Sequence, residues 1–215
     1  MKHGRMRNEP LSQAARGVAS AAILGLAVAA CGELTAGGLG EATVLVTGGV
    51  ASDDGGASAA VVAGGAEVVG TVTATLQVFV GNAGTRFVEL TDGPRSVTVD
   101  IRGELEEELA TRAVDVDDFT RVRLVYQQVT AVVESGLVVD GRPLTGPVRV
   151  RFGTDQARTA EQDAVFQVRD DRTSVMIIGL NAAAWLQAAD EATREVDSND
   201  FHGHVNTGRR GSDHR

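Results

Sequence analysis

Cysteine and histidine are nearly absent from this sequence, and both absences limit the chemistry that it can perform. Cys31 is the only cysteine among 215 residues, so no disulfide can form within the chain. No histidine occurs between Gly40 and Glu195, and histidine is the commonest general base in enzymes. The G-x-S-x-G, H-E-x-x-H, P-loop and C-x-x-C motifs are also missing. These absences predict a protein that is not an enzyme and that carries no cofactor.

Lysine is scarce as well, since it occurs only at position 2 and every later basic residue is arginine. After residue 30 the chain carries 16 arginines against 28 aspartates and glutamates, a formal charge of −12. Such an acidic chain lacks the basic surface that binds nucleic acid or anionic lipid. We therefore expect no nucleic-acid partner.

Aromatic residues are few, at one Trp, one Tyr and six Phe, so the core must be built from Val, Leu, Ile and Ala. The length of the chain suits a single domain, which can bury most of the surface that its unfolded form exposes.

The first thirty residues have the pattern of an export signal. Four basic residues precede fourteen uncharged residues, Gly17–Ala30. This apolar stretch has the length of a signal-peptide core and is shorter than the roughly 20 residues of a transmembrane helix. We predict that residues 1–30 form a signal peptide and that residues 31–39 form a flexible, glycine-rich tether.

Cys31 follows the aliphatic Val28 and the small Ala29 and Ala30, and Gly32 follows it. This pattern resembles the lipobox of bacterial lipoproteins. The resemblance implies cleavage before Cys31, a diacylglycerol on its thiol, and anchoring to a membrane outside the cytoplasm. Because Gly32 is not aspartate, it also implies the outer membrane if the host has two membranes. The alternatives are an ordinary secretory signal, a retained membrane anchor, or Cys31 as a buried apolar residue. The sequence near Cys31 offers no base that would activate a catalytic thiol.

Alternating apolar and polar residues predict β-strands through most of the chain. The clearest strand is Thr71–Val80, whose apolar face comprises Val72, Ala74, Leu76, Val78 and Val80. A turn at Gly81–Gly84 should return the chain as a hairpin partner over Arg86–Leu90. Ala42–Thr47 and Val97–Ile101 are further predicted strands, whereas Gly103–Arg112 fits a helical turn, a loop or a strand.

The stretch Arg121–Glu134 is rich in β-branched residues, which favour strands over helices, and it therefore predicts a long strand. The residues expected to face inward change from even to odd positions at Gln127-Gln128, where we therefore expect a β-bulge. Asp140-Gly141 predicts a two-residue hairpin turn. Ala164–Val168 and Ser174–Leu180 are expected to pair with each other across Asp170–Arg172.

These elements predict an all-β fold: an antiparallel, immunoglobulin-like β-sandwich of about seven to nine strands over residues 40–196. One short helix is expected near its C-terminus, capped by Asn181 and running over Ala182–Ala192. Trp185 should lie in the core. Residues 197–215 are polar and are expected to form a disordered tail.

The order of the strands is similar to that of bacterial lipoproteins of unknown function with an immunoglobulin-like domain. The matching features are ATVLVT after the tether, TRVRLVYQQVTAVVESG, the Asp-Gly hairpin, and a last strand that leads into LNAAAWL. The resemblance covers Gly40 to about Glu195 and implies no catalytic residues. Some members are described as carbohydrate-binding-like, which is an analogy of fold alone.

Four acidic clusters are candidate calcium ligands: Asp53-Asp54, Glu104 with Glu106–Glu108, Asp115 with Asp117-Asp118, and Asp170-Asp171. The third has the best local spacing, but solvated acidic loops are the simpler interpretation of all four. His202 and His204 in the predicted tail suggest at most a weak transition-metal site. We predict no metal site.

The sequence therefore predicts a membrane-anchored envelope lipoprotein whose sandwich domain binds or supports other envelope components, such as a polysaccharide or a protein. Two alternatives are a periplasmic glycoside hydrolase that uses paired carboxylates and a calcium-dependent adhesion module.

Replacing Cys31 tests the anchor directly. Because the thiol is the predicted acylation site, Cys31→Ser should abolish incorporation of radiolabelled palmitate in a bacterial host and release the protein from the membrane fraction. A Cys31→Ser protein that still takes up label and still sediments with membranes would contradict the prediction.

Overall fold

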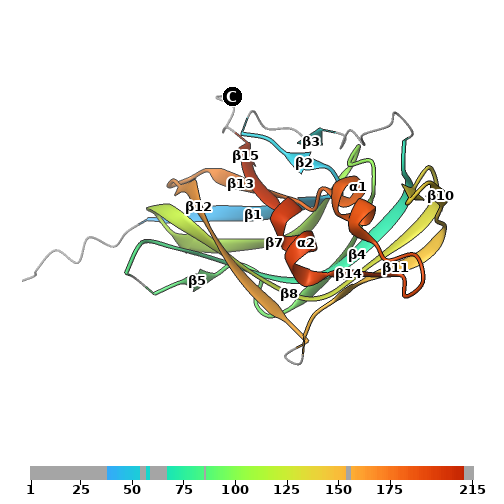
Figure 1. Ribbon diagram of the computed structural model, residues 1–215. Helices are drawn as coiled ribbons and strands as arrows, with labels where there is room; N and C mark the ends of the chain where they lie inside the picture. Colours follow the sequence, from blue (N-terminus) through green and yellow to red (C-terminus); the bar gives the residue numbers. More distant parts are fainter. Residues whose placement is uncertain (1–37, 54–56, 59–66, 85, 154–155, 211–215) are drawn as a thin grey trace, which may run out of the picture. The chain divides into compact units, whose positions relative to one another are not determined.

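The computed structural model describes residues 38–53, 57–58, 67–84, 86–153 and 156–210 (Figure 1). Cys31, the predicted signal peptide and most of the predicted tether lie outside these residues, as does Asp54. Within the described part of the chain, none of the helices is long and apolar enough to cross a membrane. The predicted all-β sandwich with a short helix near the C-terminus is confirmed.

A four-stranded sheet forms one layer of the sandwich (Figure 1). The outer strand β15 pairs antiparallel with β13, which pairs parallel with β1, and β1 pairs antiparallel with β7. In sheet order these strands are β15 (Asn206–Arg210), β13 (Thr173–Gly179), β1 (Leu39–Thr47) and β7 (Glu106–Asp115).

A seven-stranded sheet forms the other layer, built around the long strands β8 (Asp117–Ser135) and β4 (Val69–Gly81). The free side of β8 is shared, because β12 pairs with its first half and β11 with its second. The free side of β4 is shared in the same way by β6 and β5. The remaining strands are β5 (Val88–Glu89), β6 (Arg95–Asp100), β11 (Gly146–Arg151), β12 (Arg158–Val168) and β14 (Glu195–Asp197).

Short elements complete the described fold. The pairs β2 (Val50–Ala51) with β3 (Ala57–Ser58) and β9 (Val138–Val139) with β10 (Arg142–Pro143) are small antiparallel ladders. The helical pieces are α1 (Ala182–Trp185), the 3₁₀ turn η1 (Leu186–Ala188) and α2 (Ser198–His204). Asp140 and Gly141 join β9 to β10 with φ values of 51° and 78°, which confirms the predicted hairpin turn.

One apolar core lies between the sheets and contains the inward faces predicted from the sequence. All five apolar residues of the predicted β4 face are fully buried. The predicted inward residues of β8 are also buried on both sides of the parity shift, at Val122, Leu124, Tyr126, Val129, Ala131 and Val133. The β-bulge is confirmed, since Thr75 lies opposite Gln128 and Leu76 opposite Tyr126, which leaves Gln127 as the extra residue.

Within the confirmed sandwich, two details differ from the expected antiparallel arrangement of about seven to nine strands. The described residues form fifteen strand segments, and two of their pairs, β1 with β13 and β11 with β14, are parallel. The stretch Gly103–Arg112, for which the sequence left a helical turn, a loop and a strand open, is mostly strand. β7 begins at Glu106, and Leu109 faces the core.

The predicted pairing between Ala164–Val168 and Ser174–Leu180 is also wrong. β12 pairs with β8 in one sheet, whereas β13 pairs with β1 and β15 in the other, so Asp170–Arg172 carries the chain between layers. The physical reason lies in β13, where Met176, Ile177 and Ile178 are buried in succession. Such a continuous apolar run is typical of a strand that is buried on both faces and takes part in parallel pairing, as β13 does with β1.

The C-terminal helix is shorter than predicted. Asn181 has φ 44° and ψ 51° and makes no side-chain cap, and the α-helical turn ends at Trp185. Trp185 is fully buried, as expected. Past η1 the chain turns at Asp190, whose side chain accepts hydrogen bonds from the backbone N–H groups of Ala192 and Thr193. These bonds replace helical ones, so the alanines of this stretch do not extend the helix.

Residues 197–210, predicted as a disordered tail, are folded. Asp197 caps α2 by accepting from the N–H of Asn199 at 2.8 Å, and Phe201 inserts into the core with no exposed surface. Its ring meets those of Tyr126 and Trp185 edge-on, with centroids 5.1 and 5.6 Å away. The fold therefore contains His202 and His204, and the expectation of a histidine-free domain is wrong.

Phe201 tests how far this C-terminal closure stabilises the sandwich. Because Phe201 is fully buried among aromatic rings, Phe201→Ala should lower the free energy of unfolding by about 3–5 kcal/mol in urea denaturation. His204→Ala, an exposed change on the same helix, should stay within about 0.5 kcal/mol of the parent. Equal stability of the two variants would show that the C-terminal segment contributes nothing.

Candidate functional site

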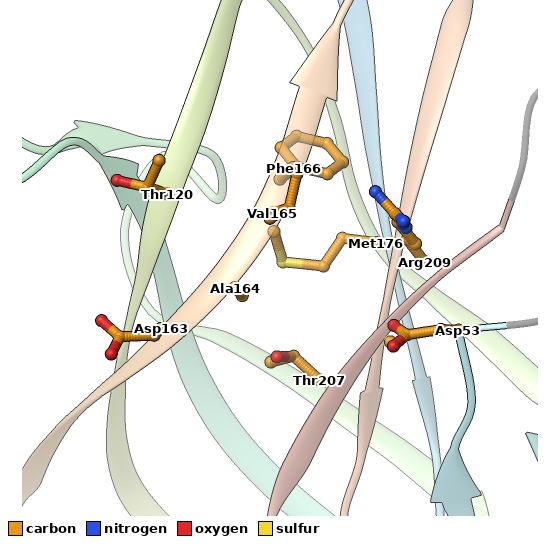
Figure 2. Close-up of a pocket in the computed structure, with 10 residues that line it drawn as sticks. Asp53, Thr120, Asp163, Ala164, Val165, Phe166, Met176, Thr207 and Arg209 are labelled. Carbon is orange, nitrogen blue, oxygen red and sulfur yellow. The ribbon is translucent and has the colours of Figure 1, made fainter.

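A groove runs along one seam of the sandwich, between β12 of one sheet and β13 and β15 of the other. Among the described strands, β12 pairs only with β8 and β15 only with β13, so each has a free edge. The groove consists of two hollows of about 340 and 350 Å³ that share Asp53, Phe166 and Arg209. We call it the seam groove, and Figure 2 shows its first hollow.

The first hollow has a mixed lining of acidic, hydroxyl and apolar side chains. It is formed by Asp53, Thr120, Asp163, Ala164, Val165, Phe166, Met176, Thr207, Gly208 and Arg209. The second hollow is formed by Asp53, Phe166, Gln167, Arg169, Arg172, Ser174, Val175, Arg209 and Arg210.

A β-bulge in β12 shapes the first hollow. Asp163 lies opposite Arg121, and Phe166 lies opposite Phe119. Between these pairs β12 advances by three residues and β8 by two, so β12 contains one extra residue. The extra residue bends β12, and Val165 is left 54% exposed. Just before the bulge the seam is closed, because Gln162 donates to the carbonyl O of Val205 at 3.1 Å and accepts from Thr207.

Four arginines line the second hollow, and two of them are fixed by acidic partners. Arg169 pairs with Asp118 at 2.6 Å and Arg210 with Glu106 at 2.5 Å. Arg172 and Arg209 form no ion pair with a carboxylate of the described residues. Two positive charges thus remain uncompensated in one hollow of an acidic protein.

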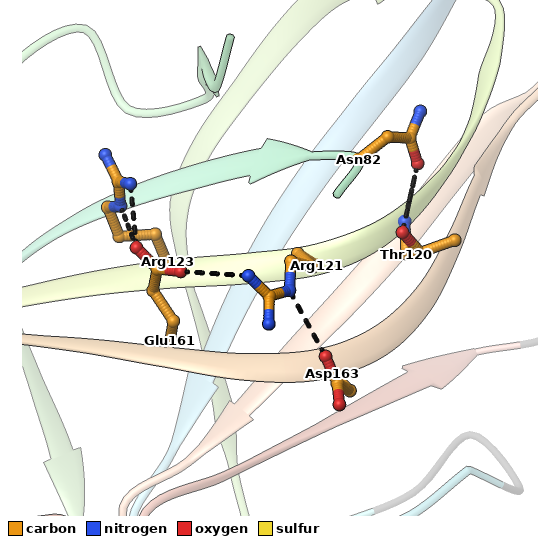
Figure 3. Close-up of polar contacts among 6 residues, drawn as sticks. All are labelled: Asn82, Thr120, Arg121, Arg123, Glu161 and Asp163. Carbon is orange, nitrogen blue, oxygen red and sulfur yellow. Dashed lines mark hydrogen bonds and ion pairs between the residues drawn. The ribbon is translucent and has the colours of Figure 1, made fainter. Parts of the chain in front are cut away.

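A ladder of ion pairs crosses from β8 to β12 beside the groove (Figure 3). Glu161 pairs with both Arg123 and Arg121, at 2.7 and 3.4 Å, and Arg121 also pairs with Asp163 at 3.3 Å. The Arg123 guanidinium lies 3.8 Å from the ring centroid of Phe87. Such exposed pairs contribute about 0–1 kcal/mol each, so the ladder acts mainly to orient Asp163.

Thr120 is positioned at the same wall by Asn82. The side-chain oxygen of Asn82 accepts from the N–H of Thr120 at 3.0 Å and from its hydroxyl at 3.2 Å (Figure 3). The hydroxyl is therefore held at the end of β4, where the first hollow begins.

The two acidic residues that line the first hollow are Asp53 and Asp163. Figure 2 shows Asp53 and Asp163 on opposite sides of the first hollow. A general acid in glycoside hydrolysis must keep its proton, which requires burial or a neighbouring carboxylate. Asp163 is instead 89% exposed in its side chain and pairs with Arg121.

The predicted metal candidates do not come together. Among the described residues there is no group of three His, Cys, Asp or Glu side chains that could hold a metal ion. In the best-spaced cluster, Asp118 pairs with Arg169, and Asp117 accepts from the side chain of Asn82. Glu104 likewise pairs with Arg102. These acids are engaged with protein partners.

A second polar feature, which the sequence did not reveal, lies beneath α2. Four buried side-chain atoms there have no hydrogen-bond partner among the described residues: Tyr126 Oη, Arg158 Nε, Trp185 Nε1 and His202 Nδ1. Burial raises the pKa of Tyr126, and Arg158 opposes the shift. Burial, and then the charge of Arg158, lowers the pKa of His202 below its ordinary value of 6.5. The sequence singled out His202 only as a weak metal candidate, and its place beneath the helix was not foreseen because its segment is polar and was predicted to be disordered.

Comparison of the chain with protein-family models, with curated proteins and with solved structures finds no match. The resemblance to immunoglobulin-like lipoproteins therefore stays a prediction. No residue role is carried over from a relative, and the candidate site stands on its own geometry.

His202 gives the stability of the protein a specific pH dependence. Because its pKa is lowered on folding, the unfolded chain binds more protons below about pH 6.5, and stability should fall as the pH drops through that value. In urea denaturation at about pH 7.5 and 5.5, His202→Gln should lose less stability between the two conditions than the parent does. His204→Gln, on the exposed side of the same helix, should keep the parental difference. Identical pH differences in the parent and in His202→Gln would contradict the prediction.

Proposed function

We propose that the chain is a lipid-anchored envelope protein whose β-sandwich binds a ligand in the seam groove without catalysing a reaction. The observation that carries the binding role is the groove itself, which opens between two free sheet edges and contains two uncompensated arginines. The anchoring role is supported by the pattern that ends at Cys31.

A binding role fits the groove better than an enzymatic one for two reasons. First, among the residues that the structure describes, no histidine or cysteine lines either hollow. Second, the ionisable side chains with strongly altered surroundings, Tyr126 and His202, lie beneath α2 and do not line the groove. Perturbed ionisable groups tend to cluster at functional sites, and here they are separate from the open surface.

Anchoring through Cys31 would give the groove its biological setting. Two or more acyl chains hold a protein firmly to a bilayer, whereas a single myristoyl chain gives only marginal binding. A domain tethered in this way meets ligands of the cell envelope at high effective concentration. The outer membrane is the proposed location in a host with two membranes.

Filling the groove tests the binding role. Val165 is exposed in the first hollow, so Val165→Trp should occupy the hollow without disturbing the core. The full chain in nonionic detergent is mixed with insoluble envelope material from a bacterium with one membrane and from one with two, and the co-sedimenting fraction is measured. Val165→Trp should lose most of the binding seen with the parent.

Val132→Trp provides the matched control, because Val132 is a similarly exposed valine on β8 that does not line the groove. This variant should bind as the parent does. Equal binding by all three proteins would place the interaction elsewhere and overturn the role of the seam groove.

A further inference from the structure

Arginine is the only basic residue type after position 2, and almost all described arginines are engaged. Three of them have no ion pair or side-chain hydrogen bond with a described residue: Arg86, Arg172 and Arg209. The other twelve bond to carboxylates, to side-chain oxygens or to backbone carbonyls. Two of the three unengaged arginines line the same hollow. In a chain with excess acid, this is a local reversal of charge.

The surroundings keep these two guanidinium groups available. Arg169 and Arg210 satisfy Asp118 and Glu106 at the margins of the hollow, so those carboxylates are already neutralised. Asp53 is the only acidic residue among the described lining of the second hollow. A guanidinium without a partner binds carboxylate and phosphate oxygens through two parallel hydrogen bonds.

The adjoining first hollow offers a different chemistry. Thr120 and Thr207 present hydroxyls, Asp163 presents a carboxylate, and the buried Phe166 and Met176 form an apolar floor. A threonine hydroxyl donates to or accepts from the hydroxyl groups of a ligand, and a carboxylate accepts from them. At about 30 Å³ per water, each hollow has room for about eleven waters, a space comparable with one sugar unit.

We propose that the seam groove binds an acidic oligosaccharide, an inference that rests on the proposed binding function. The acid group of the ligand lies between Arg172 and Arg209 in the second hollow. Its neighbouring sugar unit extends into the first hollow, with hydroxyls toward Thr120, Asp163 and Thr207. The two hollows are continuous through Phe166 and Arg209, so one ligand spans both.

A peptide that adds as a strand to the edge of β15 fits the seam less well. Gln162 already bonds to Val205 and Thr207 across the seam, which closes the first part of that edge. On the neighbouring strand residue Gly208, a Cβ atom would lie 2.6 Å from the carbonyl O of Ser52, so the chain covers one face of β15 there and leaves little room for the side chains of an added strand. A neutral sugar would lack the aromatic platform on which such ligands stack, because Phe166 is only 3% exposed.

Titration of the full chain in nonionic detergent tests the proposal with three probes: a short oligogalacturonate, a neutral galactose oligomer of the same length, and inorganic phosphate. Oligogalacturonate should bind at least about tenfold more tightly than either of the others. The double variant Arg172→Gln/Arg209→Gln should lose at least about tenfold in that affinity. Thr207→Val should weaken oligogalacturonate and leave phosphate unchanged.

Arg86→Gln is the matched control, since it removes an unengaged arginine outside the groove and should leave the affinity for oligogalacturonate unchanged. Equal loss in Arg86→Gln would show a general effect of net charge and overturn the proposal. Equal binding of the neutral oligomer would contradict the preference for an acidic ligand. Equal binding of phosphate would show that the groove binds anions without recognising a sugar, which would also overturn the proposal.

Failure of this inference is distinguishable from failure of the proposed function. If Val165→Trp still blocks binding to envelope material while oligogalacturonate does not bind, the groove binds a ligand of another class, such as a peptide. In that case the binding function stands and the acidic oligosaccharide is wrong.

Discussion

The pairing of β8 with β4 is the interaction on which the rest of the structure depends. β8 spans 19 residues and β4 spans 13, and all of β4 lies along β8. No other described strand is as long as β8, so its far side is shared between β11 and β12. β12 then departs from regular pairing at its bulge, just where the seam opens. The groove is thus a consequence of how one long strand is covered by two shorter ones.

A shortage of aromatic residues makes the closure of this sandwich depend on a polar segment. The only Trp and the only Tyr of the chain both pack against Phe201, which comes from α2. Beyond α2, Asn206 bonds to both the N–H and the carbonyl O of Ala51 and so ties β15 to β2. The C-terminal segment is therefore part of the core, and it also supplies Thr207 and Arg209 to the seam groove.

Local patterns made much of the sandwich predictable, whereas features built from distant segments were not. The β4 face, the bulge at Gln127 and the turn at Asp140-Gly141 each follow from a few adjacent residues. The parallel pairing of β1 with β13 joins segments far apart in the chain, and a run of buried residues does not specify its neighbour. The groove has the same character, because Arg172 and Arg209 meet only after folding and each alone resembles an ordinary surface residue. In the C-terminal segment, Phe201 was the one residue that indicated a folded structure. The polar composition around it favoured disorder, and a single aromatic residue did not outweigh that composition.

The free edge of β15 has a consequence for how copies of this protein behave when they are crowded. Unpaired edge strands are templates for lateral growth of a sheet, and natural proteins protect them with charge. β15 ends in Arg209 and Arg210, which alternate to opposite faces of the strand, so each face of the edge carries a cation. Arg210 is paired with Glu106, so Arg209 is the cation of this edge without an ion pair among the described residues, and two edges aligned in parallel would bring their Arg209 side chains together. Arg209, which leaves the seam accessible to small anionic molecules, therefore also discourages parallel self-association of the domain through this edge.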